Sequence, residues 1–95
     1  MTSLRRRIDT NQPEIVKVLR DAGCSIQYLH AVGQGCPDIL CGYKGVNTLI
    51  EIKDGSKSPS RRKLTPDEIE WHAAWRGQVA IVNNPMEALK AIGAI

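Results

Sequence analysis

The chain has 95 residues, of which 42% are hydrophobic and 24% are charged, so a folded domain is expected rather than a disordered chain. Its formal net charge of +3 is too small to indicate a partner by itself. No apolar stretch approaches the roughly 20 residues that a transmembrane helix needs. Because the N-terminus lacks an apolar signal segment and the three cysteines lack CxxC spacing, we expect one reduced, cytoplasmic domain spanning residues 1–95.

The first helix is predicted to begin after Asn11. Asn11 is a favourable capping residue, Pro13 fits the first turn, and Glu14 stands where a capping box has its acidic residue. Apolar residues then recur at helical spacing over residues 15–22, and Gly23 is a typical terminator.

Three strands are predicted in the middle of the chain. Residues 24–32 alternate between apolar and polar side chains, which indicates a strand, and residues 33–35 form a glycine-rich loop. Residues 38–43 and 46–53 are then expected to pair as a hairpin, with Lys44-Gly45 at the turn.

The last part of the chain predicts two further helices and one strand. Residues 54–63 form a flexible basic loop, and residues 65–68 (TPDE) are a capping box that opens a helix ending before Gly77. A short buried strand over residues 78–82 and a helix after Asn84 complete the order α-β-β-β-α-β-α. The expected fold class is therefore α/β, with a mixed sheet flanked by helices.

The predicted hairpin brings two carboxylates together. A two-residue turn pairs Tyr43 with Val46, and the same register places Asp38 opposite Glu51, with Cβ atoms about 4.5–5.5 Å apart. Lys53 lies two residues beyond Glu51 and so points to the same face. A loop of odd length would break this alignment.

Opposed carboxylates on paired strands destabilise a sheet, so their presence calls for a function. A divalent cation would relieve the repulsion, and carboxylate oxygens are the ligands that Mg²⁺ and Mn²⁺ prefer. Lys53 would add a positive charge beside that metal. A metal that activates water and a lysine that stabilises the transition state are what phosphodiester hydrolysis requires.

The same residues carry a resemblance to a known family. Pro37-Asp38 followed by Glu51-Ile52-Lys53 resembles the signature of the PD-(D/E)xK nuclease superfamily. A wider ordered pattern resembles the VRR-NUC branch, and in particular its short standalone, phage-type members. That pattern extends from residue 9 to residue 92 and comprises residues 11–14, 33–38, 49–53, 64–66 and Trp71.

The resemblance implies a restriction-endonuclease-like αβββαβ core and a Mg²⁺- or Mn²⁺-dependent endonuclease. Asp38 and Glu51 would bind the metal together with the carbonyl of Ile52. Lys53 would be the catalytic lysine, and Glu14 on the first helix would complete the metal site.

The resemblance also implies a substrate and an assembly. Standalone members resemble Holliday junction resolvases that act as homodimers on branched DNA, within the host cytoplasm if phage-encoded. Residues 85–92 and the apolar side of the Trp71 helix are candidate dimer interfaces. A nuclease acting on linear, flap or nicked DNA, and a DNA-binding module without catalysis, remain as alternatives.

Basic side chains are the candidate DNA contacts, through phosphates rather than bases. They fall in an N-terminal arm over residues 1–10 and in the loop before the second helix. The alternative for both groups is solvated charge without a partner. With Gln34 of the glycine-rich loop, the set is Arg5, Arg6, Arg7, Lys57, Arg61, Arg62 and Lys63.

Other conspicuous residues are expected to be structural. Glu68 stands where the family often has Gln and is expected to cap its helix, while His72 is expected to be packed or solvated. Trp71 and Trp75 share a helix face and should serve core or dimer packing. The cysteines should be reduced, mostly buried thiols, because their spacing fits no usual zinc module. They are Cys24, Cys36 and Cys41.

Overall fold

The structure is a computed structural model that describes residues 9–95. The predicted DNA contacts Arg5, Arg6 and Arg7 lie outside the described residues. The predicted element order is confirmed, with one 3₁₀ helix, η1, added in the basic loop. The elements are α1 (Gln12–Asp21), β1 (Ser25–Tyr28), β2 (Ile39–Tyr43), β3 (Val46–Ile52), η1 (Pro59–Arg62), α2 (Pro66–Ala74), β4 (Val79–Val82) and α3 (Pro85–Ala91).

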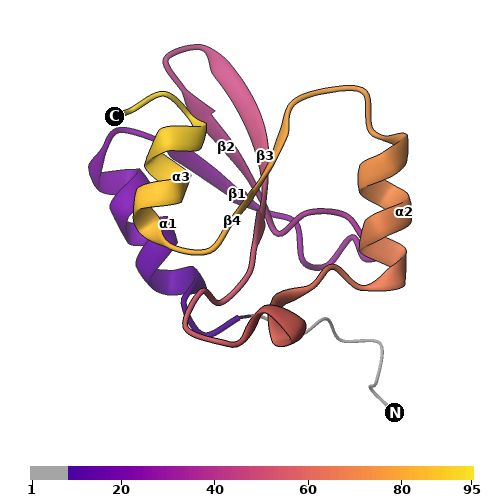
Figure 1. The fold of residues 1–95 in the computed structure, drawn as a ribbon. Helices are drawn as coiled ribbons and strands as arrows, with labels where there is room; N and C mark the ends of the chain where they lie inside the picture. Colours follow the sequence, from indigo (N-terminus) through magenta and orange to yellow (C-terminus); the bar gives the residue numbers. More distant parts are fainter. Residues whose placement is uncertain (1–8) are drawn as a thin grey trace.

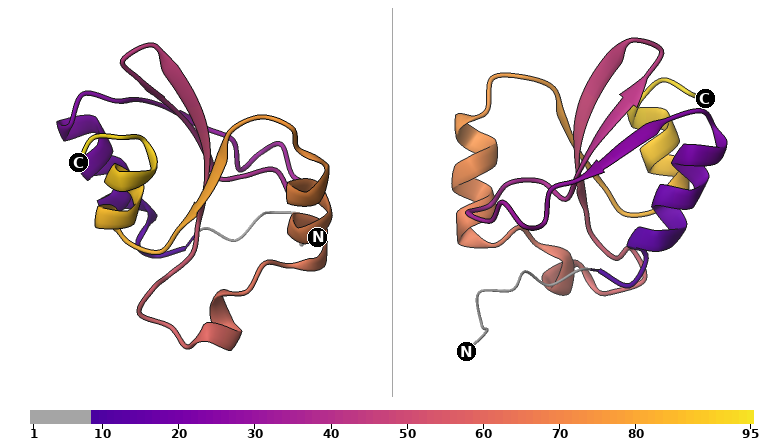
Figure 2. Two further views of the ribbon diagram at one scale, coloured as in Figure 1. Left: turned by 45° about the horizontal axis from the view of Figure 1, so that its top comes forward. Right: turned by 180° about the vertical axis from the view of Figure 1, so that it is seen from behind.

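The four strands form one mixed sheet in the order β1-β2-β3-β4. The first three strands are antiparallel neighbours, and β4 runs parallel to β3 after the crossover through α2. Helices α1 and α3 lie side by side on one face of the sheet, whereas α2 stands on the opposite side (Figure 1). The turned views in Figure 2 show the same arrangement. In residues 9–95, none of these helices is long and apolar enough to cross a bilayer.

The hydrophobic core fills the space between the sheet and the helix pair α1 and α3. Alternate residues of each strand point into it, as the two-residue period of a strand requires. The core side chains include Ile15, Leu19, Ile39, Cys41, Ile50, Ile52, Val82 and Ala88, each at most 1% exposed. The other face of β2 and β3 carries the paired Leu40 and Leu49 and, at the end of β3, Glu51.

The β2–β3 hairpin has the predicted register. Tyr43 pairs with Val46 and Ile39 pairs with Ile50. Lys44 and Gly45 form the two-residue turn with φ angles of 50° and 83°, the positive values that a type I′ turn needs. The hairpin loop is thus even in length, and one step beyond Ile39 the register places Asp38 opposite Glu51.

The strand predicted over residues 24–32 is shorter than expected. Strand β1 ends at Tyr28, and the chain then turns, with the amide of Val32 donating to the carbonyl of Leu29 at 2.9 Å. The amide of Leu29 donates to the carbonyl of Asp38 at 2.9 Å, so pairing with the segment before β2 extends one residue further.

The predicted side-chain cap of Asn11 is wrong. Asn11 makes no capping hydrogen bond; its Nδ2 donates instead to the carbonyls of Lys53, at 3.0 Å, and Asn83, at 3.2 Å. The first turn of α1 is closed by backbone, since the amide of Gln12 donates to the carbonyl of Asp9 at 3.1 Å. Asn11 therefore ties the start of α1 to the ends of β3 and β4.

Candidate active site

A cleft of about 380 Å³ opens on the face of the sheet opposite the core. Most of the predicted site residues within residues 9–95 meet there, although Glu14, Ile52 and Arg62 do not line it. The lining residues are Asp9, Gly33, Gln34, Gly35, Asp38, Glu51, Lys53, Lys57, Arg61, Lys63, Thr65, Asp67 and Glu68.

Asp38 is fixed at the floor of this cleft by the hairpin. Its side chain accepts a hydrogen bond from the amide of Ile52 at 2.6 Å, and its own amide donates to the carbonyl of Ile50 at 3.1 Å. The residue is only 5% exposed. The carboxylate is therefore held against β3 by backbone atoms that cannot easily move.

Glu51 lies beside Asp38 and is 1% exposed. Burial, together with the nearby carboxylates of Asp38 and Glu68, raises the pKa of Glu51 to about 9, although the charge of Lys53 lowers it. In the protein alone, Glu51 thus favours its neutral form at pH 7. The floor of the cleft has more carboxylates than its own cation can neutralise.

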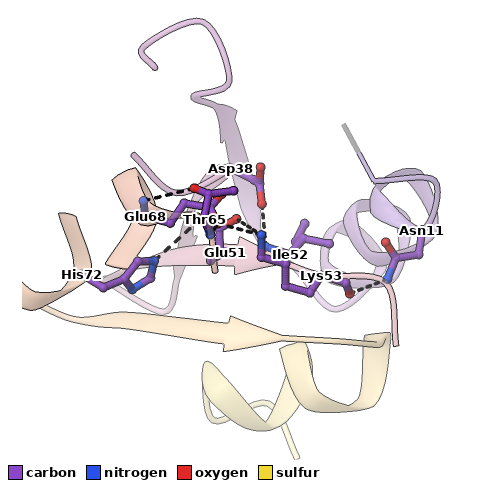
Figure 3. A network of polar contacts seen from close by, with 8 residues as sticks. All are labelled: Asn11, Asp38, Glu51, Ile52, Lys53, Thr65, Glu68 and His72. Atoms are coloured by element: carbon purple, nitrogen blue, oxygen red, sulfur yellow. Dashed lines mark hydrogen bonds and ion pairs between the residues drawn. The ribbon is translucent and has the colours of Figure 1, made fainter. Parts of the chain in front are cut away.

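Lys53 supplies that cation. Its Nζ lies 2.7 Å from Oε1 of Glu68 and 3.7 Å from Oε2 of Glu51 (Figure 3). Burial lowers the pKa of Lys53, but the hydrogen bond to Glu68 and the negative charges of Glu68 and Glu51 raise it by more. The pKa is therefore raised overall, and the lysine remains an ammonium.

Helix α2 contributes more to the site than the sequence suggested. Glu68 forms the predicted capping box with Thr65 and also pairs with Lys53. His72 has its Nε2 3.7 Å from Oε1 of Glu51, so it faces the site rather than merely packing or meeting solvent (Figure 3). The four-residue spacing of Glu68 and His72, which puts them on one helix face, is the sequence signal that could have indicated this.

The glycine-rich loop is shaped to meet α2. Gly33, Gln34 and Gly35 have consecutive positive φ angles of 77°, 56° and 84°. A Cβ on Gly35 would lie 2.3 Å from the carbonyl oxygen of Asp67, which is a clash with backbone. The absence of a side chain at Gly35 therefore allows the loop to contact the first turn of α2.

We expect Gly35→Ala to destabilise the protein by roughly 2–5 kcal/mol, because it adds a backbone clash to positive-φ strain. Gly45→Ala is the matched control, since Gly45 has nearly the same φ, 83°, with nothing within 4 Å of the position that an added methyl would occupy. It should cost about 1–2 kcal/mol. Urea unfolding measures both, and equal losses would contradict the close packing of the loop on α2.

The structure does not bring Glu14 to the site. Glu14 is exposed and lines a separate hollow with Asp54 and Asn84, so the proposed role in completing the metal site is not supported. Asp9 lines the cleft instead. Burial raises the pKa of Asp9, while the positive charge of Lys53 lowers it and the negative charge of Asp38 raises it.

This difference predicts unequal effects of two matched substitutions. On the phosphodiester hydrolysis that the sequence predicts, Asp9→Asn is expected to cause a loss of about tenfold, the effect of roughly 1.4 kcal/mol on a barrier, because it removes a charge from the cleft. Glu14→Gln should leave the rate unchanged. Both variants would be assayed at saturating metal, and a large loss in Glu14→Gln alone would reverse the assignment.

A basic rim surrounds this acidic floor. Lys57, Arg61 and Lys63 line the cleft from the segment that contains η1. Arg62 is directed differently, since its Nε donates to the carbonyl of Lys57 at 3.1 Å. The predicted flexible loop is thus partly ordered, and three of its four predicted DNA contacts reach the cleft.

Comparisons with known proteins address the fold. No family model matches the sequence, and a search of curated proteins finds no match. Among solved structures, the chain is similar to one described as "VRR_NUC domain", with a TM-score of 0.63 and 22% sequence identity, covering 90% of this chain and 97% of that one. The chain has a VRR_NUC fold. This confirms the fold expected from the resemblance.

The donor set of this VRR_NUC fold suits a hard cation. Asp38, directly before β2, and Glu51 on β3 present buried carboxylates of the kind that Mg²⁺ or Mn²⁺ prefers. Within residues 9–95, however, no three Asp, Glu, His or Cys side chains already converge on one metal position. A metal would therefore be held by these two carboxylates with backbone or water oxygens.

The remaining predictions concern side chains around the VRR_NUC core. Cys24, Cys36 and Cys41 are buried free thiols, as predicted. Trp71 and Trp75 stack on each other, with ring centroids 4.7 Å apart and an interplanar angle of 17°. Trp75 is exposed, so this pair is not part of the core between the sheet and α1.

Proposed function

We propose that this protein is a metal-dependent endodeoxyribonuclease of the PD-(D/E)xK superfamily, in its VRR-NUC branch. One observation carries the proposal: a buried pair of carboxylates lies beside a lysine whose side chain is only 12% exposed, at the floor of a cleft with a basic rim. An acidic floor alone would repel a phosphodiester. With a divalent cation bound, the same floor would attract it.

Asp38 and Glu51 are the proposed metal ligands, with the carbonyl of Ile52 as a backbone ligand. A bound Mg²⁺ or Mn²⁺ would neutralise phosphate charge and make its bound water more acidic. Lys53 is the proposed catalytic lysine, which stabilises negative charge on the phosphoryl group or holds the attacking water. Its ammonium is kept charged and in place by Glu68.

The basic rim is proposed to bind the DNA backbone. Lys57, Arg61 and Lys63 surround the cleft, and Gln34 extends the lining on the side of the glycine-rich loop. These cations contact phosphates rather than bases, so they would bring DNA to the site without fixing a sequence. Arg62 supports the loop through its bond to the Lys57 carbonyl.

We further propose that the substrate is branched DNA, such as a Holliday junction, and that the active form is a homodimer. A junction has a two-fold arrangement that two related sites would match. Exposed apolar side chains on the α2 side of the molecule support a subunit contact there. They are Ile69, Trp75 and Ile81. The other candidate interface is α3. Its residue Ala88 packs in the core of the subunit and so is not available for a subunit contact.

The decisive experiment compares a labelled four-way junction with a linear duplex of the same arms, in Mn²⁺, Mg²⁺ or EDTA. Paired cuts in the junction alone, only with metal, are expected. Sedimentation of the protein at the assay concentration tests the homodimer in the same sample. Cutting of linear, flap or nicked DNA equally well would keep the nuclease and remove the junction preference.

Binding without cutting would contradict the enzyme and leave a DNA-binding module. The two functions also differ in their response to EDTA. Hydrolysis should stop when EDTA removes the metal. Binding through the basic rim alone should persist in EDTA, because it does not use the carboxylate pair.

A further inference from the structure

One oxygen atom of Glu68 joins the first turn of helix α2 to Lys53, the residue that follows β3. Oε1 of Glu68 accepts a hydrogen bond from the amide of Thr65 at 2.9 Å. The same Oε1 accepts from Nζ of Lys53 at 2.7 Å. Glu68 is thus the acidic member of the capping box and the partner of the lysine at once.

The capping box fixes Glu68 from both ends. The amide of Glu68 donates to Oγ1 of Thr65 at 3.3 Å, which orients the backbone that carries the carboxylate. Both Lys53 and Glu68 have side chains that are nearly buried, at 12% and 8% exposed. Solvent therefore screens the pair poorly, and the direction of the carboxylate determines where the ammonium lies.

Helix α2 depends on such contacts, because it makes few contacts with the other helices and strands. Its first turn also meets the glycine-rich loop at Gly35, and His72 meets Glu51 one turn further on. The position of the helix and the position of the reactive side chains are consequently set by the same bonds.

We propose that the Thr65–Glu68 capping box is a positioning device for Lys53, an inference that rests on the proposed nuclease function. Glu68 is a positioning residue that directs the ammonium toward the carboxylate pair, and Thr65 acts through Glu68. A helix cap, ordinarily a matter of stability, here controls the geometry of the reaction.

Two variants break the device and two are controls. Glu68→Ala removes both bonds to Oε1, and Thr65→Val removes the Oγ1 acceptor while keeping the shape of the side chain. Thr65→Ser retains a hydroxyl. Asn84→Ala removes the cap of α3, where the side chain of Asn84 accepts from the amide of Glu87 at 2.9 Å, and Asn84 neither lines the cleft nor bonds to Glu68.

Two readouts separate positioning from stability. The first is kcat against KM on the DNA substrate: kcat should fall by about 10²-fold in Glu68→Ala and by roughly tenfold in Thr65→Val, with KM near the wild-type value. The second is the nitrogen–proton NMR signal of the Lys53 ammonium, assigned by its absence in Lys53→Met. This signal should be sharp in the wild type and weak or absent in both variants.

Thr65→Ser and Asn84→Ala should keep the wild-type kcat and the ammonium signal, although Asn84→Ala unfolds at lower urea concentration. The proposal is overturned if Thr65→Val loses no more kcat than Asn84→Ala, or if the ammonium signal persists in Glu68→Ala. If the wild type cuts no DNA, the nuclease function fails, and the NMR comparison still decides whether the capping box holds Lys53.

Discussion

Lys53→Met is expected to lower the rate of phosphodiester hydrolysis by about 10²- to 10³-fold. The ammonium of Lys53 is the cation at the floor of the cleft, 3.7 Å from Glu51, where the reacting phosphate would lie. Methionine keeps the length and the apolar stem of the side chain but not its charge. Single-turnover cleavage at saturating metal measures the loss directly.

Folding has to be controlled in this experiment, because Lys53→Met leaves the buried carboxylate of Glu68 without its cation. The double variant Lys53→Met/Glu68→Gln removes that unpaired charge and should fold well while remaining inactive. Lys57→Met on the rim should retain most of the single-turnover rate, bind DNA more weakly, and lose affinity less steeply than the wild type as salt rises. Cleavage by Lys53→Met at the wild-type rate would rule out the proposed role of the lysine.

Glu51→Gln is expected to abolish both cleavage and stabilisation by metal. A cation that binds the native wild-type protein at 100 times its dissociation constant adds about 2.7 kcal/mol to the free energy of unfolding. For a domain of this size, that raises Tm by roughly 10 °C or more. Thermal unfolding in Mn²⁺ against EDTA would show this shift in the wild type and in the exposed control Glu70→Gln, but not in Glu51→Gln.

The same variant should behave differently without metal. Because burial and neighbouring carboxylates raise the pKa of Glu51 to about 9 in the folded protein, from an ordinary value of 4.5, the wild type loses stability as pH rises through this interval. Glutamine cannot ionise. In EDTA, Glu51→Gln should therefore have the higher Tm, by a margin that grows up to about pH 9. A margin that is independent of pH would contradict the buried, proton-retaining carboxyl.

The sequence predicted the parts of the site that depend on local geometry. An even hairpin loop at Lys44-Gly45 and the two-residue period of strands were enough to set Asp38 against Glu51, with Lys53 on the same face. The capping box of α2 was likewise recognisable, because its donors and acceptors lie within four residues of each other.

The parts that were missed depend on contacts between distant segments. The sequence around Asn11 is compatible with two arrangements. The side chain could cap its own helix, or it could bond to the ends of β3 and β4, as it does here. That choice places Asp9, and not Glu14, at the cleft. No local pattern distinguishes the two acids, since the outcome is decided by how α1 docks.

The alternation along β3 divides the strand between two tasks. Ile50 and Ile52 fill the core, while Glu51 between them and Lys53, directly after the strand, face the cleft. A change such as Ile50→Val alters packing without changing any group that meets the substrate. Substitutions in the core and changes to the site can therefore accumulate in adjacent positions at the end of β3 with little interference.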